Sequence, residues 1–379
     1  MKIIIAPDSF KDSLSSIEIC RIIENSIHAE APDIVTESIP VADGGEGFVE
    51  TLVAATNGRI VTSRVTGPLG DKVDAEWGML GDEETAVVGM AAASGLMLVP
   101  QKKRNPLETT TFGTGELIRR AVDSGCKRIL VGIGGSATTD MGTGMAQALG
   151  VRFLDAAGNE ITEPMNGRLM GKVERIDLSG IRIDTNAVNI SAACDVSNPL
   201  LGEQGAVRVY SPQKGADAAM CDELEANMTH LAGIVAKTIR DVRNIPGAGA
   251  AGGIGAGLTA FLNAELVPGI QLVLDVCRFQ ERIRDANWII TGEGRIDDQI
   301  IFGKTIAGIC RIANAIQVPV IAVAGAVTAS RDVLNKTGLY ACFPIVNRPM
   351  NLASAIRETK SLLDRTIRDI IKLIKYDEY

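Results

Sequence analysis

The stretch WIITGEGRIDDQIIFGKT, residues 288–305, joins a short apolar run to a turn rich in glycine, acids and cations. Its last three letters match the end of a P-loop, which requires the pattern G-x-x-x-x-G-K-[ST] so that backbone N–H groups wrap the phosphates. Counting back from Gly303 places Asp298 where the first glycine of that pattern should stand. A carboxylate there would repel a phosphate. The stretch is therefore not a P-loop, and Thr305 is expected at the start of the following helix.

Apolar runs like the one that opens this stretch recur along the chain, and each is followed by a helical pattern. The runs are residues 3–6, 34–41, 129–133, 188–193, 288–290, 318–324 and 340–346. Because they are continuous, they are typical of strands covered on both faces, as in parallel sheets. Ser15 and Glu18 form a capping box for a helix ending near His28, and Asn351 is expected to cap an apolar-faced helix at the end of the chain. The pattern predicts an α/β fold.

Two stretches interrupt this order and divide the chain. Residues 59–80 alternate and turn twice at glycines, which predicts an antiparallel hairpin, and residues 151–183 are irregular. We expect a discontinuous Rossmann-like or flavodoxin-like parallel-sheet domain over residues 1–65 and 281–379. A second α/β domain, residues 66–280, is expected as an insertion. The active site is expected in the cleft between the two domains, where closure would exclude water.

Composition and charge exclude several classes of function. The net charge is −8 and no cluster of basic residues offsets it, which argues against a nucleic-acid partner. The seven cysteines are scattered without a C-x-x-C pair, and no run approaches the length of a membrane span. Two histidines without a metal-ligand spacing, and the lack of a G-x-S-x-G elbow, disfavour a zinc or serine hydrolase. These features predict a cytoplasmic protein with no membrane partner.

Two glycine-rich turns are candidates for ligand contact. The segment Gly134-Gly135-Ser136-Ala137-Thr138 follows an apolar strand directly, so its N–H groups and the next helix could bind an anion such as phosphate. The same pattern also fits an ordinary turn with Ser and Thr caps. The run GAGAAG at 247–252 matches a dinucleotide fingerprint only formally, because a polar, proline-terminated segment precedes it. It is expected to approach either a ligand or another element.

Acidic residues gather at the predicted strand ends, where ligands bind in open α/β sheets. Each acid alone could be only a turn residue. Together with basic residues and glycine turns, however, they are typical of magnesium-dependent phosphoryl transfer, in which positioning and charge neutralisation dominate. The acids are Asp8, Asp43, Asp195, Glu293 and Asp297, and the basic residues are Lys11, Arg295 and Lys304. The residues by themselves therefore predict a magnesium-dependent phosphotransferase without a standard kinase motif.

Along nearly its whole length the chain resembles the bacterial type I glycerate kinases. The stretches that carry the resemblance occur in the family's order and include APDSFKDSLSS, IPVADGGEGF, NPLETTTFGTGELI, GIGGSATTD, DVSNPLLGEQGA, SPQKGA, GAGAAGGIGAGLTAFLNAELVPGIQLVLD and TGEGRIDDQ with GK. The resemblance implies a two-domain α/β enzyme that uses ATP and Mg²⁺ to phosphorylate D-glycerate. The usual product of this type is 2-phosphoglycerate, downstream of glyoxylate or sugar-diacid breakdown. A homodimer is compatible with this assignment.

The resemblance and the strand-end placement together suggest roles for these residues. Lys11 or Arg295 would hold the glycerate carboxylate, and Asp195 or Asp8 would accept the hydroxyl proton. The remaining candidates are the metal ligands Asp43, Glu293 and Asp297 and the phosphate-binding residues Gly134, Gly135, Ser136, Thr138 and Lys304.

The sequence departs from the family at Gly89, where an acid is common, and at Thr139 and Met141, where Asn and Gly are usual. If that acid holds a metal or substrate, its loss would weaken activity or change the acceptor. Two alternatives follow from this departure: a non-catalytic sugar-acid sensor on the same fold, and a kinase for a related hydroxy acid.

Overall fold

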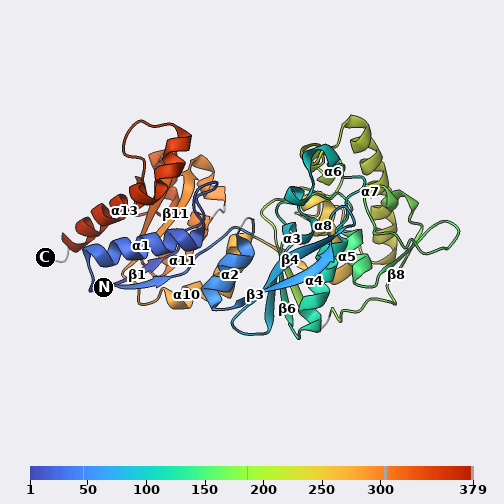
Figure 1. Cartoon of the computed structure of the whole chain (residues 1–379), viewed down its shortest axis with the longest axis horizontal. Helices are drawn as coiled ribbons and strands as arrows, with labels where there is room; N and C mark the ends of the chain where they lie inside the picture. Colours follow the sequence, from blue (N-terminus) through green and yellow to red (C-terminus); the bar gives the residue numbers. More distant parts are fainter. Residues whose placement is uncertain (46, 186, 303–304, 377–379) are drawn as a thin grey trace. The chain divides into compact units, whose positions relative to one another are not determined.

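The computed structural model describes residues 1–45, 47–185, 187–302 and 305–376 (Figure 1). The chain forms two compact units. The first consists of Met1–Asp43, Glu50–Thr56 and Ile270–Tyr379, and the second of Gly44–Val49 and Asn57–Gly269. Both ends of the chain belong to the first unit.

The first unit is built on a sheet of parallel strands in the order β13-β12-β11-β1-β2. Its strands are β1 (Lys2–Ile5), β2 (Val35–Ser38), β11 (Trp288–Ile296), β12 (Val320–Val327) and β13 (Ala341–Pro344). Counted within the unit, this order is 2-1-3-4-5, the flavodoxin-like arrangement. The chain proceeds from β1 to one side and later returns on the other side, so the topological switch point lies between β1 and β11. The predicted parallel α/β sheet is confirmed.

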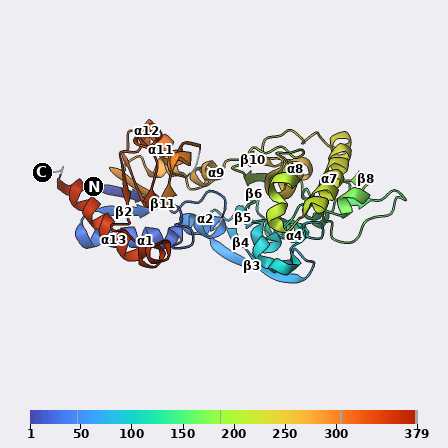
Figure 2. The ribbon, with the colours of Figure 1, turned by 90° about the horizontal axis from the view of Figure 1, so that it is seen from above.

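Helices cover both faces of this sheet because its strands are apolar on both sides. Figure 2 shows α1 (Ser16–Glu30) and α13 (Leu352–Tyr376) on one side of the sheet, and α11 (Thr305–Ala315) and α12 (Arg331–Thr337) on the other. Ile3 and Ile5 of β1 pack in the core under α1 and α13, whereas Ile4 between them is equally buried outside that cluster. This alternation is the pleat of a doubly covered strand.

The helix ends follow the predicted caps. The Ser15 side chain accepts a hydrogen bond from the Glu18 backbone N–H at 3.3 Å, and the Glu18 carboxylate accepts one from the Ser15 N–H at 2.9 Å. Asn351 accepts from the Ser354 N–H at 2.8 Å at the start of α13. The remaining helices with most of their residues in the first unit are α2 (Phe48–Thr56), α9 (Gly269–Val276) and α10 (Phe279–Arg282), with the short 3₁₀ segment η5 (Asp298–Phe302).

The second unit has a mixed sheet in the order β10-β9-β6-β5-β4-β3. Its strands are β3 (Arg59–Thr66), β4 (Lys72–Met79), β5 (Thr85–Gly89), β6 (Arg128–Gly132), β9 (Asn189–Ala193) and β10 (Glu265–Val267), and a separate pair is β7 (Arg152–Leu154) with β8 (Arg175–Asp177). The predicted hairpin over residues 59–80 is the antiparallel pair β3–β4. A domain boundary near residue 65 would fall inside β3, whose ladder with β4 runs from Arg59 to Thr66.

The helices of the second unit are mostly short. They are α3 (Ala91–Ser94), α4 (Phe112–Asp123), α5 (Thr143–Ala148), α6 (Ala206–Tyr210), α7 (Ala218–Thr238) and α8 (Ala250–Leu262), with 3₁₀ turns η1 (Leu96–Leu98), η2 (Gln101–Lys103), η3 (Leu169–Lys172) and η4 (Pro212–Lys214). Phe153 of β7 meets Phe261 of α8 edge to face, with ring centroids 5.9 Å apart, inside the core of this unit. None of the helices in the described ranges has the length and apolar character needed to cross a membrane.

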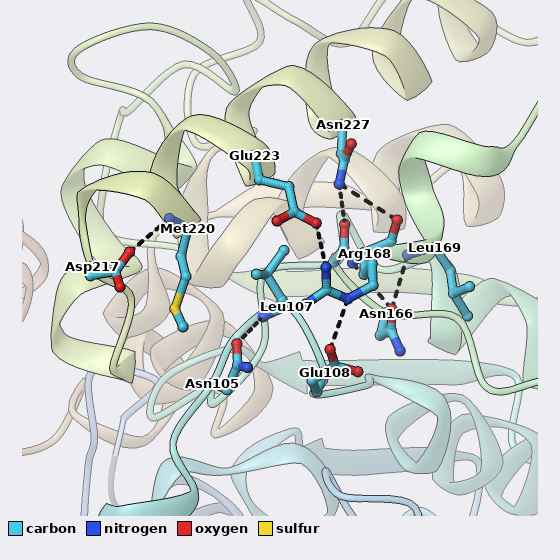
Figure 3. Close-up of polar contacts among 11 residues, drawn as sticks. Asn105, Leu107, Glu108, Asn166, Arg168, Leu169, Asp217, Met220, Glu223 and Asn227 are labelled. Atoms are coloured by element: carbon cyan, nitrogen blue, oxygen red, sulfur yellow. Dashed lines mark hydrogen bonds and ion pairs between the residues drawn. The ribbon is translucent and has the colours of Figure 1, made fainter.

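A polar cluster around Arg168 connects α7 to two loops of the second unit (Figure 3). The Arg168 guanidinium donates to Glu108 at 2.8 Å and to Glu223 of α7 at 2.7 Å, and Asn227 donates to the Gly167 carbonyl at 3.1 Å. Each exposed ion pair alone contributes little free energy. Several contacts on one arginine nevertheless restrict the loop that contains Glu108 and leads into Thr111, a residue of the site described next.

Candidate functional site

Asp8 lies at the switch point of the first unit, just after β1. Its backbone N–H donates to the Gly292 carbonyl of β11 at 2.8 Å, so the loop is held against the neighbouring strand. Its carboxylate accepts hydrogen bonds from the Thr305 hydroxyl and from the Ser9 N–H, both at 2.6 Å.

The pKa of Asp8 is raised to about 6, mainly by burial and also by the negative charge of Asp43, while the bonds from Thr305 and Ser9 act in the opposite direction. A carboxylate with a pKa near neutrality can accept a proton and release it again, as a general base must.

Thr305 is the first residue of α11, as the rejection of the P-loop predicted. It is 1 % exposed, and its hydroxyl binds Asp8 across 297 positions of sequence. The sequence carried no signal for this contact, because it depends on the pairing of β1 with β11. Thr305 is thus a positioning residue for Asp8.

The three predicted metal ligands occupy different surroundings. Asp43 is exposed, and its charge is close enough to raise the pKa of Asp8. Asp297 accepts from the Gln299 N–H at 3.0 Å and lies 3.7 Å from the Arg295 guanidinium, and Glu293 is half-buried in β11. Within the described ranges, no three His, Cys, Asp or Glu residues are close enough to hold a metal ion together. Magnesium commonly takes only one or two carboxylates together with substrate phosphates. The metal site stays a prediction.

The candidate basic residues of the first unit also lie at the strand ends. Lys11 follows β1 and is exposed, and its ammonium has no ion-pair or hydrogen-bond partner among the residues that the structure describes. Arg295 of β11 has a side chain that is 66 % exposed. Both line one cavity at the carboxyl ends of the strands. Lys304 falls outside the described residues.

In the second unit, the glycine turn after β6 is only partly open to a ligand. Gly134 and Gly135 are exposed, and Gly135 has a positive φ of 72° that favours glycine. Ser136 is 8 % and Thr138 0 % exposed. A ligand that reaches this turn would therefore first meet the backbone of the two glycines rather than the two hydroxyl groups.

The start of the following helix α5 is not open, because Asp140 occupies it. This fully buried carboxylate accepts hydrogen bonds from the N–H groups of Gly142 and Gly144 at 3.2 and 3.3 Å. It also binds the Thr111 hydroxyl at 2.7 Å and the Thr111 N–H at 2.9 Å. The carboxylate oxygens of Asp140 already satisfy these donors, while burial raises the pKa of the group. The start of α5, which was expected to help bind an anion, is therefore capped by Asp140 from within the protein.

Lys214 is the main feature of this site that sequence reasoning missed. It ends η4, is 2 % exposed, and donates through Nζ to Ser136 Oγ at 2.8 Å and to the Thr138 carbonyl at 2.6 Å. Burial lowers the pKa of Lys214 to about 7, and the charge of Asp140 opposes that shift. A lysine in this position puts an amine that is positively charged below about pH 7 directly behind the glycine turn. The only sequence signal was its place in SPQKGA, one of the stretches shared with the glycerate kinases.

The glycine run at 247–252 approaches another element, which was one of its two expected roles. Gly252 has a φ of +82°, and a Cβ there would lie 2.0 Å from the Thr138 carbonyl oxygen and 2.9 Å from Lys214 Nζ. In α8, a Cβ on Gly257 would lie 2.3 Å from the Met141 carbonyl oxygen. These glycines let α8 pack against the backbone that follows the glycine turn.

Asp195 follows β9 and is exposed. Its carboxylate accepts from the Gly269 N–H at 2.9 Å, at the start of α9. This contact is that of a loop-anchoring acid, and it leaves the proposed role of Asp195 in proton transfer as a prediction.

Comparisons with known proteins cover the whole chain. The model of the family described as "Glycerate kinase family" matches residues 3–375. A glycerate kinase of Bacillus subtilis is 49% identical over 376 residues, which is 99% of this chain and 98% of the relative. A glycerate 2-kinase of Escherichia coli is 48% identical over 371 residues, 98% of this chain and 97% of the relative. A solved structure from Salmonella typhimurium LT2, assigned to glycerate kinase 2, superposes with a TM-score of 0.91 at 45% identity and covers 100% of this chain and 99% of its own.

Proposed function

Because this chain belongs to the glycerate kinase family and is a kinase, we propose that it phosphorylates D-glycerate with ATP and Mg²⁺, to give 2-phosphoglycerate. We further propose a role in the breakdown of glyoxylate or sugar diacids. The observation in this chain that supports the reaction best is Asp8, which has a pKa of about 6 and lies in the loop after β1 that also carries the exposed Lys11. This loop therefore supplies both a proton acceptor and a binding group for an anionic alcohol.

In the proposed mechanism, Asp8 accepts the proton of the attacking glycerate hydroxyl. The Thr305 hydroxyl, 2.6 Å from Asp8 Oδ2, keeps the carboxylate oriented and preferentially stabilises its charged form. Asp195 is the alternative base, as an exposed acid at the end of β9. Phosphoryl transfer needs little covalent help from the protein, so orientation of the hydroxyl and neutralisation of charge supply most of the rate.

The charged groups of the reactants would be distributed over the remaining candidates. Lys11 or Arg295 binds the glycerate carboxylate, and the other contacts the phosphates. The exposed Gly134–Gly135 backbone, with Lys214 behind it, binds a phosphate group. Asp43, Glu293 and Asp297 are the residues that would hold Mg²⁺, which when bound neutralises the phosphate charge. The expected location of the site in a cleft, and homodimerisation, stay predictions.

The decisive test is the release of ADP by the purified protein with ATP and Mg²⁺. D-Glycerate should support turnover, lactate, tartronate and hydroxypyruvate should support much less, and EDTA should abolish turnover. Phosphorus NMR of the product then distinguishes 2-phosphoglycerate from 3-phosphoglycerate. Thermal stabilisation by glycerate without any ADP release would overturn the proposal and favour the sensor that Gly89 suggested.

A further inference from the structure

A cavity of about 660 Å³ lies within the first unit, at the carboxyl ends of four neighbouring strands. Its lining comes from the loop after β1, the ends of β11, β12 and β13, and the first turns of α13. In open parallel sheets ligands bind at this edge, beside the switch point. The volume is within the usual range of small-molecule sites, roughly 300–1,000 Å³. A three-carbon acid would fill only a small part of it.

The wall of the cavity is predominantly apolar. Its apolar side chains include Phe10, Val327, Ile345, Val346, Met350 and Ile356. Two hydroxyl groups in the wall already have partners inside the protein, because Ser13 donates to Thr359 Oγ1 at 2.8 Å and Thr359 donates to the Ala355 carbonyl at 2.8 Å. The wall therefore suits a flat apolar group better than a small polyhydroxylated acid.

Positive charge enters this cavity from the switch-point strands. Lys11 follows β1 and Arg295 lies in β11, and both are lining residues with exposed side chains. The ligand class that combines a large apolar ring system with several negative charges is a nucleoside phosphate. A cavity with apolar walls beside two basic residues matches that combination in size and charge.

We propose that this cavity binds the adenosine end of the nucleotide, with its phosphates directed toward whichever of Lys11 and Arg295 does not bind the glycerate carboxylate. This inference rests on the proposed function, since it locates the binding site of the phosphate donor. It assigns the loop at residues 344–350 and the start of α13 to nucleotide recognition, a role that no motif in the sequence indicated.

The test uses the full chain and magnesium ADP as the probe. Ala355 lines the cavity, so Ala355→Phe should fill part of it and weaken ADP binding at least tenfold by calorimetric titration. Ala353 is exposed in the same helix turn and does not line the cavity, so Ala353→Phe is the matched control and should leave the ADP affinity unchanged. Binding of tripolyphosphate, which lacks the nucleoside, should be affected much less by Ala355→Phe. Equal melting temperatures of the two variants would exclude misfolding.

Photolabelling gives an independent readout on the unmodified protein. Irradiation with 8-azido-ADP should label peptides from residues 344–359, and excess ADP should prevent the labelling. Labelling elsewhere, or equal ADP affinity of Ala355→Phe and Ala353→Phe, would overturn the cavity assignment while leaving the kinase proposal intact. Weaker glycerate binding with unchanged ADP binding in Ala355→Phe would assign the cavity to the acid instead. Failure of the wild-type protein to bind ADP at all would overturn the proposed function itself, and this inference with it.

Discussion

At the scale of single residues, the site contains one acid and one basic residue, Asp8 and Lys214, whose charged forms are disfavoured by burial. Asp8 has its pKa raised to about 6, mainly by burial, and Lys214 has its pKa lowered to about 7, also by burial. Perturbed values of this kind concentrate at functional sites, although structural networks can produce them too. Mutations that separate stability from activity therefore give the clearest test at this scale.

Replacing Asp8 by Asn should lower kcat by about 10²-fold or more, the lower end for loss of a general base. The same change should raise the melting temperature at pH 7.5. The pKa of Asp8 lies above its ordinary value of 3.8 in the folded state, so the stability that this group contributes is present at low pH and is lost as the pH rises through about 6. The Asn variant lacks that loss, so its advantage should shrink as the pH falls through 5 and disappear only below about pH 3.8, the ordinary pKa of the group. Retained activity with a lower melting temperature at pH 7.5 would instead make Asp8 a turn cap.

Replacing Thr305 by Val should shift the acid limb of kcat/KM to higher pH. The Thr305 hydroxyl stabilises the charged form of Asp8, so its removal raises the pKa of the proposed base further. We expect little loss of activity at pH 8 and a clear loss at pH 6. Thr366→Val is the control, since the Thr366 hydroxyl donates to the Leu362 carbonyl within its own helix α13. An unchanged pH profile in Thr305→Val would separate Asp8 from the pH-dependent step.

At the scale of elements, the glycine turn after β6 is held from behind. Lys214 of η4 donates to the Thr138 carbonyl of the turn, and α8 approaches the same carbonyl at Gly252. Asp140 joins the turn to Thr111 at the start of α4. These contacts leave only Gly134 and Gly135 exposed. The shape of the turn is thus a property of several elements that are far apart in the sequence.

Replacing Lys214 by Met should raise the KM for ATP about tenfold and reduce kcat less, because the methionine keeps the volume but removes the charge and both hydrogen bonds. Lys237→Met on the exposed side of α7 is the control. Lys214→Arg should not restore activity, since a larger planar group does not fit the buried site. Unchanged ATP kinetics in Lys214→Met would limit Lys214 to a structural role.

An alanine substitution at Gly252 tests how closely α8 approaches the turn, and one at Gly233 in α7 serves as the comparison. Gly252→Ala should lower the melting temperature by several degrees, since it combines a φ of +82° with a Cβ only 2.0 Å from the Thr138 carbonyl oxygen. Gly233 lies inside α7, and a Cβ there would meet nothing within 4 Å. Gly233→Ala should therefore stabilise the protein, by about 0.5–1 kcal/mol from helix propensity. Thermal unfolding of both variants, at the same pH, compares them directly, and destabilisation by both would contradict this account.

At the scale of the whole molecule, the chain leaves the first unit after β2, contributes Glu50–Thr56 to it, and returns to it at Ile270, before β11. All six strands of the mixed sheet lie between these points, and the first unit is assembled from sequence-distant parts. Ordering a discontinuous sheet requires closure of a long loop, although the entropic cost of loop closure grows only slowly with length.

A fragment of residues 44–269 should fold by itself, because it contains the complete mixed sheet and the core of the second unit. It should show one cooperative thermal transition by circular dichroism. A fragment of residues 66–280, the domain expected from sequence alone, lacks nearly all of β3 and exposes the edge of β4. We expect this second fragment to aggregate or melt without cooperativity. Equal stability of the two fragments would show that β3 contributes little to the second unit.

The sequence alone determined the features that depend on local patterns. The apolar runs at 3–6, 129–133 and 288–290 form strands that pair in parallel with their neighbours, residues 59–80 form a hairpin, and Ser15 and Glu18 cap α1. Asp298 excluded the P-loop. The order of the motifs along the chain indicated the glycerate kinase family, to which the family model and the relatives assign the chain. Periodicity, capping and motif order are contained within short stretches, so no tertiary information is needed to read them.

Only the tertiary structure decided which groups meet. The bond from Thr305 to Asp8, the burial of Lys214 behind Ser136, the occupation of the start of α5 by Asp140, and the cavity beside Lys11 all join segments distant in the sequence. Burial and its effect on pKa are also properties of the packed molecule, because the same carboxylate in an open loop would keep its ordinary value. A sequence pattern can place a charged residue at a strand end. Which neighbour removes it from water, and which donor it then accepts from, depends on how the strands are ordered in the sheet.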